Sequence, residues 1–183
     1  MALALILIAV LVVIAIVFFS YYNRFATLEN RVDNSLSQID VQLKRRADLI
    51  PNLIETVKGF TKHEAAAIKS VTDARKALVS AQGIENRVKA DKALQGALGR
   101  IFALAENYPT LKADSNFLEL QRELATTEDR IAYARQFYND SILSYNDLCK
   151  LLPGKFFAGI YGKKPKQYLQ IVEAEKKNVK VQF

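Results

Sequence analysis

The feature that most constrains this chain is an unbroken run of eighteen apolar side chains over residues 2–19. A helix rises about 1.5 Å per residue, so this run covers about the 30 Å hydrocarbon thickness of a bilayer. The sequence therefore predicts one transmembrane helix, which ties the rest of the chain to a membrane.

The same run has two other interpretations, a cleaved secretory signal and the buried core helix of a soluble protein. A secretory signal begins with Lys or Arg and ends at small residues, whereas no basic residue precedes this run and bulky Tyr21 and Tyr22 follow it. Eighteen uninterrupted apolar residues are unusual in the core of a small domain. We therefore expect a retained anchor, with the two tyrosines in the interfacial aromatic belt.

Basic residues follow the run and do not precede it. The nearest ones are Arg24, Arg31, Lys44, Arg45 and Arg46. Positively charged flanks stay on the cytoplasmic side of a membrane. We expect a single-pass protein of the inner (cytoplasmic) membrane, with the N-terminus outside and the C-terminal domain in the cytoplasm.

Composition limits the chemistry that the chain can perform. Of its 183 residues, about 160 lie outside the anchor, enough for a single soluble domain. Cys149 and His63 are the only cysteine and histidine, which excludes an intramolecular disulfide and a His or Cys metal cluster. No metal and no cofactor is expected. His63 stands beside Glu64 with no nucleophile or glycine loop near it in the sequence, so we expect a helix-surface histidine.

The net charge of +7 is concentrated near the C-terminus. Residues 1–149 contain 18 Lys or Arg against 17 Asp or Glu, whereas residues 150–183 contain eight Lys against two Glu. The balance argues against a nucleic-acid-binding face spread over the helices, and no nucleic-acid partner is expected. The excess predicts a local electrostatic contact made by the C-terminal segment.

Apolar residues recur at steps of three and four along most of the chain, with little Gly or Pro, which is typical of amphipathic helices that pack in a bundle. The four apolar seams cover residues 25–43, 50–81, 88–105 and 117–148. Only small hydroxyl residues, Thr127 and Ser141, interrupt the last seam. No Gly or Pro occurs from residue 18 to residue 43, so we expect one helix that passes from lipid directly into the bundle.

Three segments are expected to separate these helices. They are residues 44–48, where charge replaces the seam, Gln82-Gly83, and Asn107-Tyr108-Pro109. Pro51 is placed in the first turn of the second helix, where its missing N–H costs nothing. Short connections require antiparallel neighbours. The expected fold is all-α, an N-terminal transmembrane helix leading into an antiparallel up-and-down four-helix bundle.

This topology also assigns the connections to ends and the residues to domains. The turns at residues 44–48 and 107–114 share the end far from the membrane, whereas Gln82-Gly83 and the tail lie near it. The expected domains are a transmembrane anchor, a four-helix bundle and a basic, aromatic-containing tail, over residues 1–22, 23–149 and 150–183.

Two long stretches resemble the signature of the LemA family. They are IDVQLKRRADLIPNLIETVKGFTKHE at residues 39–64 and AENYPTLKADSNFLELQRELATTEDRIAYARQFYN at residues 105–139, followed by Tyr145-Asn146 and Pro153. The resemblance covers nearly the whole chain. It implies a single-pass bacterial membrane protein with an antiparallel helical bundle. It implies no activity, because the family has no established enzymatic reaction or catalytic residues to carry over.

A cluster of charge marks the first expected turn. Lys44, Arg45, Arg46 and Asp48 form a candidate protein-docking patch, to which Glu106 and Asp114 of the neighbouring turn add acidic groups. Asp40 stands four residues before Lys44 and is placed for an ion pair with it. The alternative is a turn whose charges are paired with one another and solvated.

Asparagines recur at helical spacing on two of the expected helices. Asn23, Asn30 and Asn34 lie at steps of seven and four, and Asn139 and Asn146 are seven apart. The topology brings both sets near the membrane, where they form a candidate interhelical polar network. A satisfied buried asparagine fixes the register of its partners. The alternative is that all five are solvated.

The tail interleaves aromatic residues with lysines. Its candidate membrane-contact residues are Phe156, Phe157, Tyr161, Lys163, Lys164 and Lys166. Basic residues near an anionic cytoplasmic leaflet each contribute about 1 kcal/mol. In the alternative interpretation, the aromatic residues cover the open end of the bundle.

These observations favour a non-catalytic scaffold or adaptor at the membrane, whose expected partners are membrane lipid and a protein of unknown identity. A lipid-binding module is the first alternative. An envelope-associated hydrolase ranks lower, because it needs a clustered acid, base or nucleophile that the sequence pattern does not contain.

Overall fold

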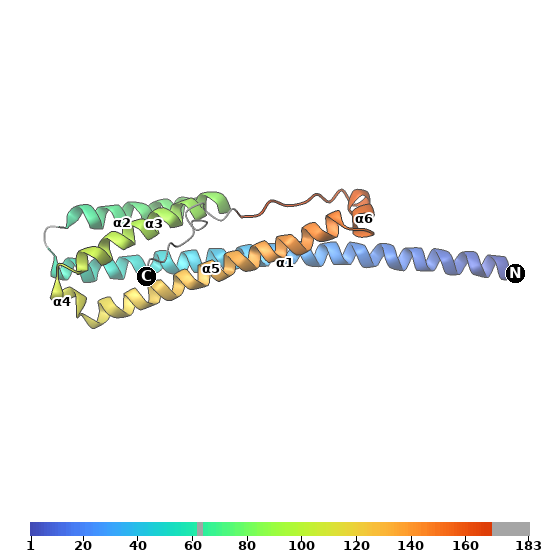
Figure 1. Ribbon diagram of the computed structural model, residues 1–183. Coiled ribbons are helices and arrows are strands. Elements are labelled where there is room, and N and C mark those ends of the chain that lie inside the picture. The colour runs from blue at the N-terminus through green and yellow to red at the C-terminus, as the bar shows by residue number, and fades with distance from the viewer. Residues whose placement is uncertain (62–63, 170–183) are drawn as a thin grey trace, which may run out of the picture. The chain divides into compact units, whose positions relative to one another are not determined.

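The computed structural model describes residues 1–61 and 64–169 of the chain. Its elements are α1 (Ala2–Phe60), α2 (Ala65–Ser80), α3 (Ile84–Ala105), α4 (Pro109–Lys112), α5 (Ser115–Lys150) and α6 (Gly154–Ile160) (Figure 1). No strand occurs in this described part. The predicted all-α class is confirmed, and His63 lies outside the described residues.

The chain divides into two compact units, which we describe separately. Unit 1 combines Met1–Ser35 with Gln136–Phe183, and unit 2 is Leu36–Arg135. The helices α1 and α5 contribute residues to both units, whereas α2, α3 and α4 belong to unit 2 and α6 belongs to unit 1. Each candidate site described below lies within one unit.

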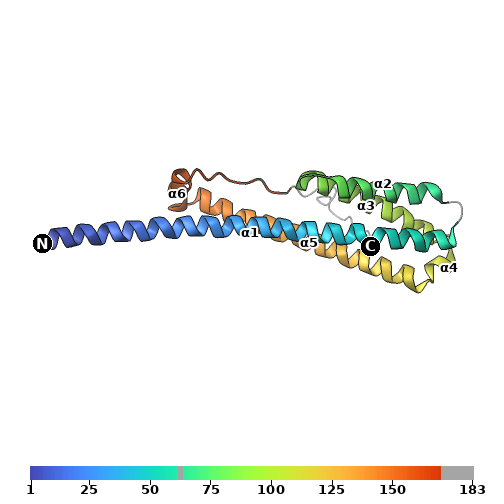
Figure 2. The same ribbon diagram turned by 180° about the vertical axis from the view of Figure 1, so that it is seen from behind.

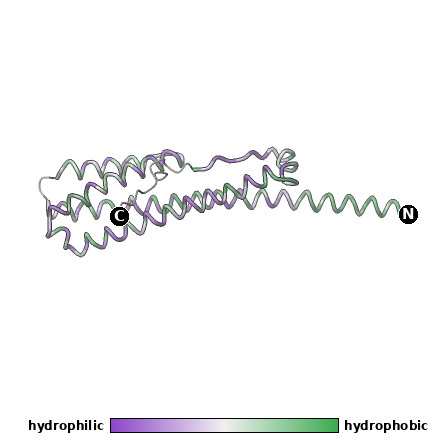
Figure 3. Tube along the Cα trace, viewed as in Figure 1, coloured by the Kyte–Doolittle hydropathy of each residue, from purple (hydrophilic) through white to green (hydrophobic). Residues whose placement is uncertain are grey.

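The N-terminal part of α1 is apolar on all sides, as the continuous hydrophobic colour in Figure 3 shows. It is the one helix among the described residues with the length and composition to cross a membrane, and none of its most apolar stretch is buried inside the structure. A soluble core helix would be covered by other elements. Full exposure of an apolar stretch of this length fits a membrane span.

The predicted turn at residues 44–48 is wrong, because α1 continues through it to Phe60. Arg46 occupies the seam between Leu43 and Ile50 and is 2% exposed, whereas Lys44 and Asp48 lie at the surface. The seam is therefore not interrupted: a paired cation replaces one apolar member of it. The predicted continuity of the helix from residue 18 to residue 43 is confirmed.

Pro51 lies inside α1 and not in the first turn of a new helix, as was predicted. A proline has no N–H to donate to the carbonyl four residues earlier, which here belongs to Ala47. Arg75 of α2 supplies the missing donor, since its Nε lies 2.8 Å from the Ala47 oxygen. The helix tolerates the proline because a neighbouring helix satisfies the carbonyl that the proline leaves free.

The predicted second helix, over residues 50–81, is in fact two helices. Its first part is the end of α1 and its second part is α2, with Thr61 and Glu64 between them outside both helices. The break predicted at Gly83 is confirmed, and this glycine has a φ of 77°, a conformation that side chains disfavour. The break before Pro109 is also confirmed, with Pro109 as the first residue of α4.

Contacts between helices hold unit 2 together. The helices α2 and α3 lie side by side along their length in both views (Figures 1 and 2). Arg75 joins α2 to α1, and Arg46 of α1 reaches both α3 and α5. The buried apolar side chains of the seams fill the space between them, among them Leu53, Leu94 and Leu124.

Tyr108 joins the connections that follow α1 and α3. Its hydroxyl donates to Glu64 Oε1 at 3.0 Å, and this hydrogen bond, with burial and the nearby carboxylate charge, raises the pKa of Tyr108. This hydrogen bond places Tyr108, in the connection after α3, beside Glu64, which lies between α1 and α2. The prediction that residues 44–48 share this end is wrong, because those residues lie within α1.

The two hydroxyl residues predicted in the seam of α5 are buried there. Thr127 donates to the Glu123 carbonyl at 2.7 Å, and Ser141 donates to the Phe137 carbonyl at 2.8 Å. Both hydroxyls are satisfied within their own helix, so they occupy seam positions without an unpaired polar group.

Candidate functional site

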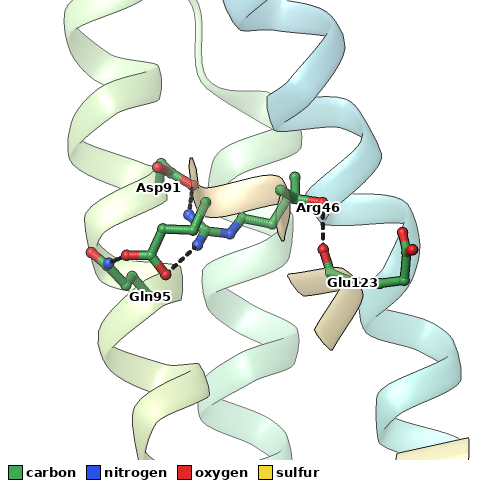
Figure 4. Close-up of polar contacts among 6 residues, drawn as sticks. Arg46, Asp91, Gln95 and Glu123 are labelled. Carbon is green, nitrogen blue, oxygen red and sulfur yellow. Dashed lines mark hydrogen bonds and ion pairs between the residues drawn. The ribbon is translucent and has the colours of Figure 1, made fainter. Parts of the chain in front are cut away.

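The candidate docking patch contains a buried ion-pair network in unit 2. Arg46 Nη1 lies 2.8 Å from Asp91 Oδ1 on α3 (Figure 4). Its Nη2 lies 3.2 Å from Glu128 Oε2 on α5. Gln95 also donates to Glu128. The guanidinium fork presents two N–H groups in fixed directions, which suits a cation between two carboxylates. Arg46 therefore joins three helices and is not available to a partner protein.

The other members of the predicted patch are also distributed differently from the prediction. Arg45 pairs with Glu123 at 2.7 Å in a half-exposed position. Asp40 pairs with Arg87 of α3 and not with Lys44, as had been expected. Arg45 and Asp40 therefore both have partners within unit 2.

The acidic groups expected to join the patch have local partners. Glu106 pairs with Lys112 at 2.5 Å, and Asp114 Oδ1 accepts a hydrogen bond from the Phe117 amide at 2.9 Å. Asp114 thereby caps the first turn of α5. Both carboxylates are used within the connection between α3 and α5.

A groove remains beside the exposed members of the patch. Its volume is about 390 Å³, and it is lined by residues of α1, α2 and α3: Asp40, Leu43, Lys44, Ala47, Asp48, Arg75, Leu78, Val79 and Arg87. The two arginines of the groove are engaged, Arg75 with the Ala47 carbonyl and Arg87 with Asp40. Lys44 and Asp48 are its exposed charges.

The aromatic residues of the tail pack on α1 at the end of the apolar run, within unit 1. The Phe157 ring stacks on Tyr21 with centroids 4.4 Å apart, and the Tyr161 ring makes edge contacts with Phe18 and Phe25. The Tyr161 hydroxyl donates to the Phe18 carbonyl at 2.6 Å. These contacts fix α6 beside the last turn of the apolar stretch.

Other apolar side chains around α6 remain exposed. Phe156 is 66% exposed, and Leu151, Leu152 and Ile160 are also exposed. Lys155, within α6, and Lys164, a few residues after it, are also exposed. The tail therefore presents apolar and basic groups together, next to the helix that is long enough to cross a membrane.

A glycine allows α6 to begin so close to α5. A Cβ at Gly154 would overlap the Leu148 backbone oxygen, and Gly154 itself is buried. Only a residue without a side chain fits against that carbonyl.

Two of the predicted asparagines hold the backbone of the tail. Asn146 Oδ1 accepts from the Lys166 amide at 2.8 Å, and its Nδ2 donates to the Lys166 carbonyl at 2.9 Å. Asn139 contacts Leu169 in the same way, at 2.9 Å and 3.1 Å. We call Asn139 and Asn146 the asparagine clamp. Each member satisfies both backbone groups of one tail residue.

Side chains of the tail segment contact the same face of unit 1. Lys163 Nζ lies 2.7 Å from Glu29 Oε2, and Lys166 Nζ lies over the Tyr145 ring, 5.4 Å from its centroid. Leu169 is 8% exposed. Burial raises the pKa of Tyr145, assisted by Cys149 and Glu29, so its hydroxyl remains a donor to Glu29 at 3.3 Å.

The five predicted asparagines therefore do not form one interhelical network. Asn23, Asn30 and Asn34 lie at the surface of α1, whereas the clamp asparagines bind the tail backbone. The partner that sequence reasoning missed is the segment 163–169. The signal that could have identified it is the three-residue spacing of Lys163, Lys166 and Leu169 opposite asparagines seven residues apart.

Ionisable groups gather in unit 1 around Cys149, where Tyr145, Glu29 and Lys163 interact. Residues 1–61 and 64–169 contain no group of three or more His, Cys, Asp or Glu side chains that could hold a metal ion. Cys149 is buried, and this burial raises the pKa of its thiol. A thiol with a raised pKa is a weak nucleophile at neutral pH.

Comparison with known proteins gives similar chains from three species. MamQ, a magnetosome protein of Magnetospirillum gryphiswaldense, is 30% identical over 173 residues, which are 80% of this chain and 64% of that protein. Magnetosome protein MamQ 2 of Paramagnetospirillum magneticum is 29% identical over 195 residues, covering 91% of this chain and 72% of its own length. Protein LemA of Metamycoplasma hominis is 28% identical over 141 residues, covering 73% and 63%.

The chain thus spans just under two thirds of MamQ from M. gryphiswaldense and of LemA from M. hominis. A family model described as LemA family matches residues 35–183, which include α2 to α6 and both clamp asparagines. The match agrees with the resemblance seen in the two long sequence stretches. The chain belongs to the LemA family.

Proposed function

We propose that this protein is a single-pass, membrane-anchored helical scaffold or adaptor without catalytic activity. The apolar, fully exposed N-terminal part of α1 supports the anchor. Among the described residues no group of His, Cys, Asp or Glu side chains could hold a metal ion, and burial raises the pKa of the Cys149 thiol. The names of the MamQ relatives state a location, the magnetosome, and no reaction.

The proposal keeps the expected orientation and domain division. We place the N-terminus outside the inner (cytoplasmic) membrane and the C-terminal part in the cytoplasm, because basic residues such as Arg24 and Arg31 follow the span. The domains are the anchor (1–22), an antiparallel up-and-down four-helix bundle (23–149) and the tail (150–183). The contacts of Arg46 and Arg75, which join α1, α2, α3 and α5, support the bundle.

The observation that carries the proposal is the position of α6. Aromatic contacts with Tyr21 and Phe18 fix this helix beside the end of the span. Phe156 and Leu152 are left exposed there, among lysines. Short helices with an apolar face and basic flanks lie in the headgroup region of anionic membranes. We therefore assign α6 and its flanking residues to the bilayer surface.

In this proposal each of the two interpretations of the tail applies to different aromatic residues. Phe157 and Tyr161 cover α1, whereas Phe156 makes only an edge contact with Phe157 among the aromatic rings and is 66% exposed. Phe156, Lys155 and Lys164 are the residues we propose to contact lipid. Lys163 and Lys166 are engaged with Glu29 and the Tyr145 ring.

The test uses the full chain in lipid nanodiscs, with a fluorescent residue introduced in α6. The chain contains no tryptophan, so Phe156→Trp introduces a single indole, which can be excited at wavelengths that the tyrosines do not absorb. We expect its emission to be quenched by brominated lipid, and more strongly when the bilayer contains anionic lipid. Tyr133→Trp is the matched control, since Tyr133 lies on α5 in unit 2 and is 70% exposed. Equal quenching of both variants, or of neither, would contradict the proposal.

The same experiment separates the scaffold from the alternative of a lipid-binding module. A scaffold that rests on the bilayer depends on surface charge, so adding Lys155→Glu and Lys164→Glu to the Phe156→Trp variant should weaken the quenching of its indole. A module that binds one lipid in a pocket would instead show quenching by that lipid alone. Protein contacts of the scaffold are assigned to the exposed charges Lys44 and Asp48 beside the groove of unit 2.

A further inference from the structure

The asparagine clamp and the tail segment match each other in length. Asn139 and Asn146 are seven residues apart on a helix, about 10.5 Å at 1.5 Å per residue. Lys166 and Leu169 are three residues apart in a segment outside any helix or strand, about 10 Å when extended. The higher-numbered asparagine contacts the lower-numbered tail residue, so the segment runs antiparallel to α5.

The clamp recognises the backbone of the segment that it binds. Each asparagine accepts from one N–H and donates to one C=O, which any residue except proline provides. Side-chain selectivity comes from neighbouring groups: carboxylate Glu29, the Tyr145 ring and a buried position for Leu169. The site therefore selects an extended peptide with a lysine, a second lysine and an apolar residue at steps of three.

A step of three is the period of an extended left-handed chain, in which every third side chain lies on one side. Lys163, Lys166 and Leu169 are on the side toward α1 and α5, whereas Gln167 and Tyr168 between them are exposed. The segment 163–169 is thus held in the manner of a bound peptide, by its backbone and one row of side chains.

Gly162 separates this segment from α6. Its φ is 66°, in the region that favours glycine, and it follows the end of α6 at Ile160. Rotation at this residue would let the segment leave the clamp at the cost of one capping bond, from the Lys163 N–H to the Ala158 carbonyl of α6. A segment that leaves one clamp exposes the same N–H and C=O groups for another.

We propose that the asparagine clamp is a binding site for an extended peptide of this pattern, and that its partner in trans is the segment 163–169 of a second copy of the chain. Each copy carries both the clamp and the fitting segment, so exchange between two copies preserves every contact. Anchoring in one membrane raises the effective concentration of the copies and favours the exchange. The inference goes beyond the proposed bilayer contact and does not depend on it.

The first experiment measures peptide binding to the full chain in detergent micelles without anionic lipid. The probe is a fluorescent, end-capped peptide with the sequence of residues 163–169, Lys-Lys-Pro-Lys-Gln-Tyr-Leu. The receptor carries Lys163→Glu and Leu169→Asp, which weaken its own segment. We expect saturable binding by anisotropy, weaker by about tenfold or more when Asn139→Asp and Asn146→Asp remove both side-chain donors.

A chemical control tests whether the backbone is recognised. N-methylation of the peptide at the Lys166 and Leu169 positions removes the two N–H donors and should abolish binding. N-methylation at the Gln167 position, an amide that the clamp does not contact, should leave most of the binding. Absence of binding to the receptor variant, or equal binding of the two methylated peptides, would overturn the clamp as a peptide site.

The second experiment tests exchange between copies. One tagged chain carries the clamp substitutions and an intact segment, and the other carries the segment substitutions and an intact clamp. We expect the mixture to co-purify in micelles at a level well above that of either variant with itself. Co-purification no greater than for the separate variants would overturn a second copy as the partner. Because both experiments omit anionic lipid, their outcome is independent of the test of Phe156.

Discussion

The Arg46 network of unit 2 and the asparagine clamp of unit 1 both consist of polar side chains on helix faces that also carry buried apolar residues. Arg46 is a buried cation that holds carboxylates from α3 and α5, so it binds regular helices to one another. The clamp consists of neutral amides that hold a segment outside any helix or strand. A buried charge without its partner is costly, whereas a neutral amide can exchange one backbone partner for another. The first site suits permanent structure and the second suits a replaceable contact.

Loss of the buried cation should have the largest effect on stability. Arg46→Leu leaves Asp91 and Glu128 without the charge between them. Removing one partner of a buried ion pair costs about 3–5 kcal/mol, and the partial exposure of Glu128 places the expected loss near the lower end. Urea unfolding of the full chain in detergent, followed by circular dichroism, measures the change.

Arg45→Leu is the matched control for this substitution. Arg45 pairs with Glu123 at a similar distance, but 44% of its side chain is exposed. Exposed ion pairs contribute less than about 1 kcal/mol. Equal losses for the two variants would show that burial does not distinguish the two arginines.

A backbone contact in unit 1 should give the next largest effect. Gly154→Ala places a Cβ against the Leu148 carbonyl, which cannot move without disturbing α5. Overpacking of this kind costs about 1–3 kcal/mol. We expect faster trypsin cleavage after Lys155, because α6 can no longer pack closely against the end of α5. Gly99→Ala should be neutral or stabilising, since nothing lies within 4 Å of its added methyl group in α3.

The clamp should contribute less than the cation. Asn146→Leu leaves the Lys166 N–H and C=O without their partner, which costs about 1–2 kcal/mol. Asn30→Leu, at an exposed asparagine of the same unit, should stay within about 0.5 kcal/mol of the parent. Urea unfolding compares the two. An unchanged or increased free energy of unfolding in Asn146→Leu would show that the clamp does not stabilise the fold through the tail segment.

The smallest effect is expected at Pro51, where it can be isolated by a double-mutant cycle. Arg75→Met removes the donor to the Ala47 carbonyl and should cost about 1 kcal/mol. In a Pro51→Ala background residue 51 donates to this carbonyl itself, so the same substitution should cost less. Thermal unfolding of the four variants gives the coupling. Additive effects would mean that Arg75 does not compensate for the proline.

Local patterns predicted much of the helical framework. The apolar run, the seams and the breaks at Gly83 and Pro109 follow from periodicity and from the backbone limits of Gly and Pro. These signals act over a few residues. The error at residues 44–48 arose because a charge at a seam position resembles a turn until its partners, 45 and 82 residues away in the sequence, are known.

The candidate sites depended more on contacts that no local pattern contains. Pro51 is accepted inside α1 because of Arg75, whose bond to Ala47 spans 28 residues of sequence. Asn139 and Asn146 were identified as polar members of a helix face, but their partners lie in the segment 163–169, whose three-residue spacing is informative only beside asparagines seven residues apart. Sequence reasoning found the residues that carry the polar contacts and assigned them to the wrong partners.

The most direct test of the clamp is amide hydrogen exchange, measured by NMR on the full chain in detergent micelles. The Lys166 and Leu169 amides donate to the clamp, whereas the Gln167 amide lies between them and does not. The account predicts slow exchange at Lys166 and Leu169 and fast exchange at Gln167. This difference should disappear in the double variant that carries Asn139→Ala and Asn146→Ala. Equal exchange rates at the three amides of the parent chain would contradict it.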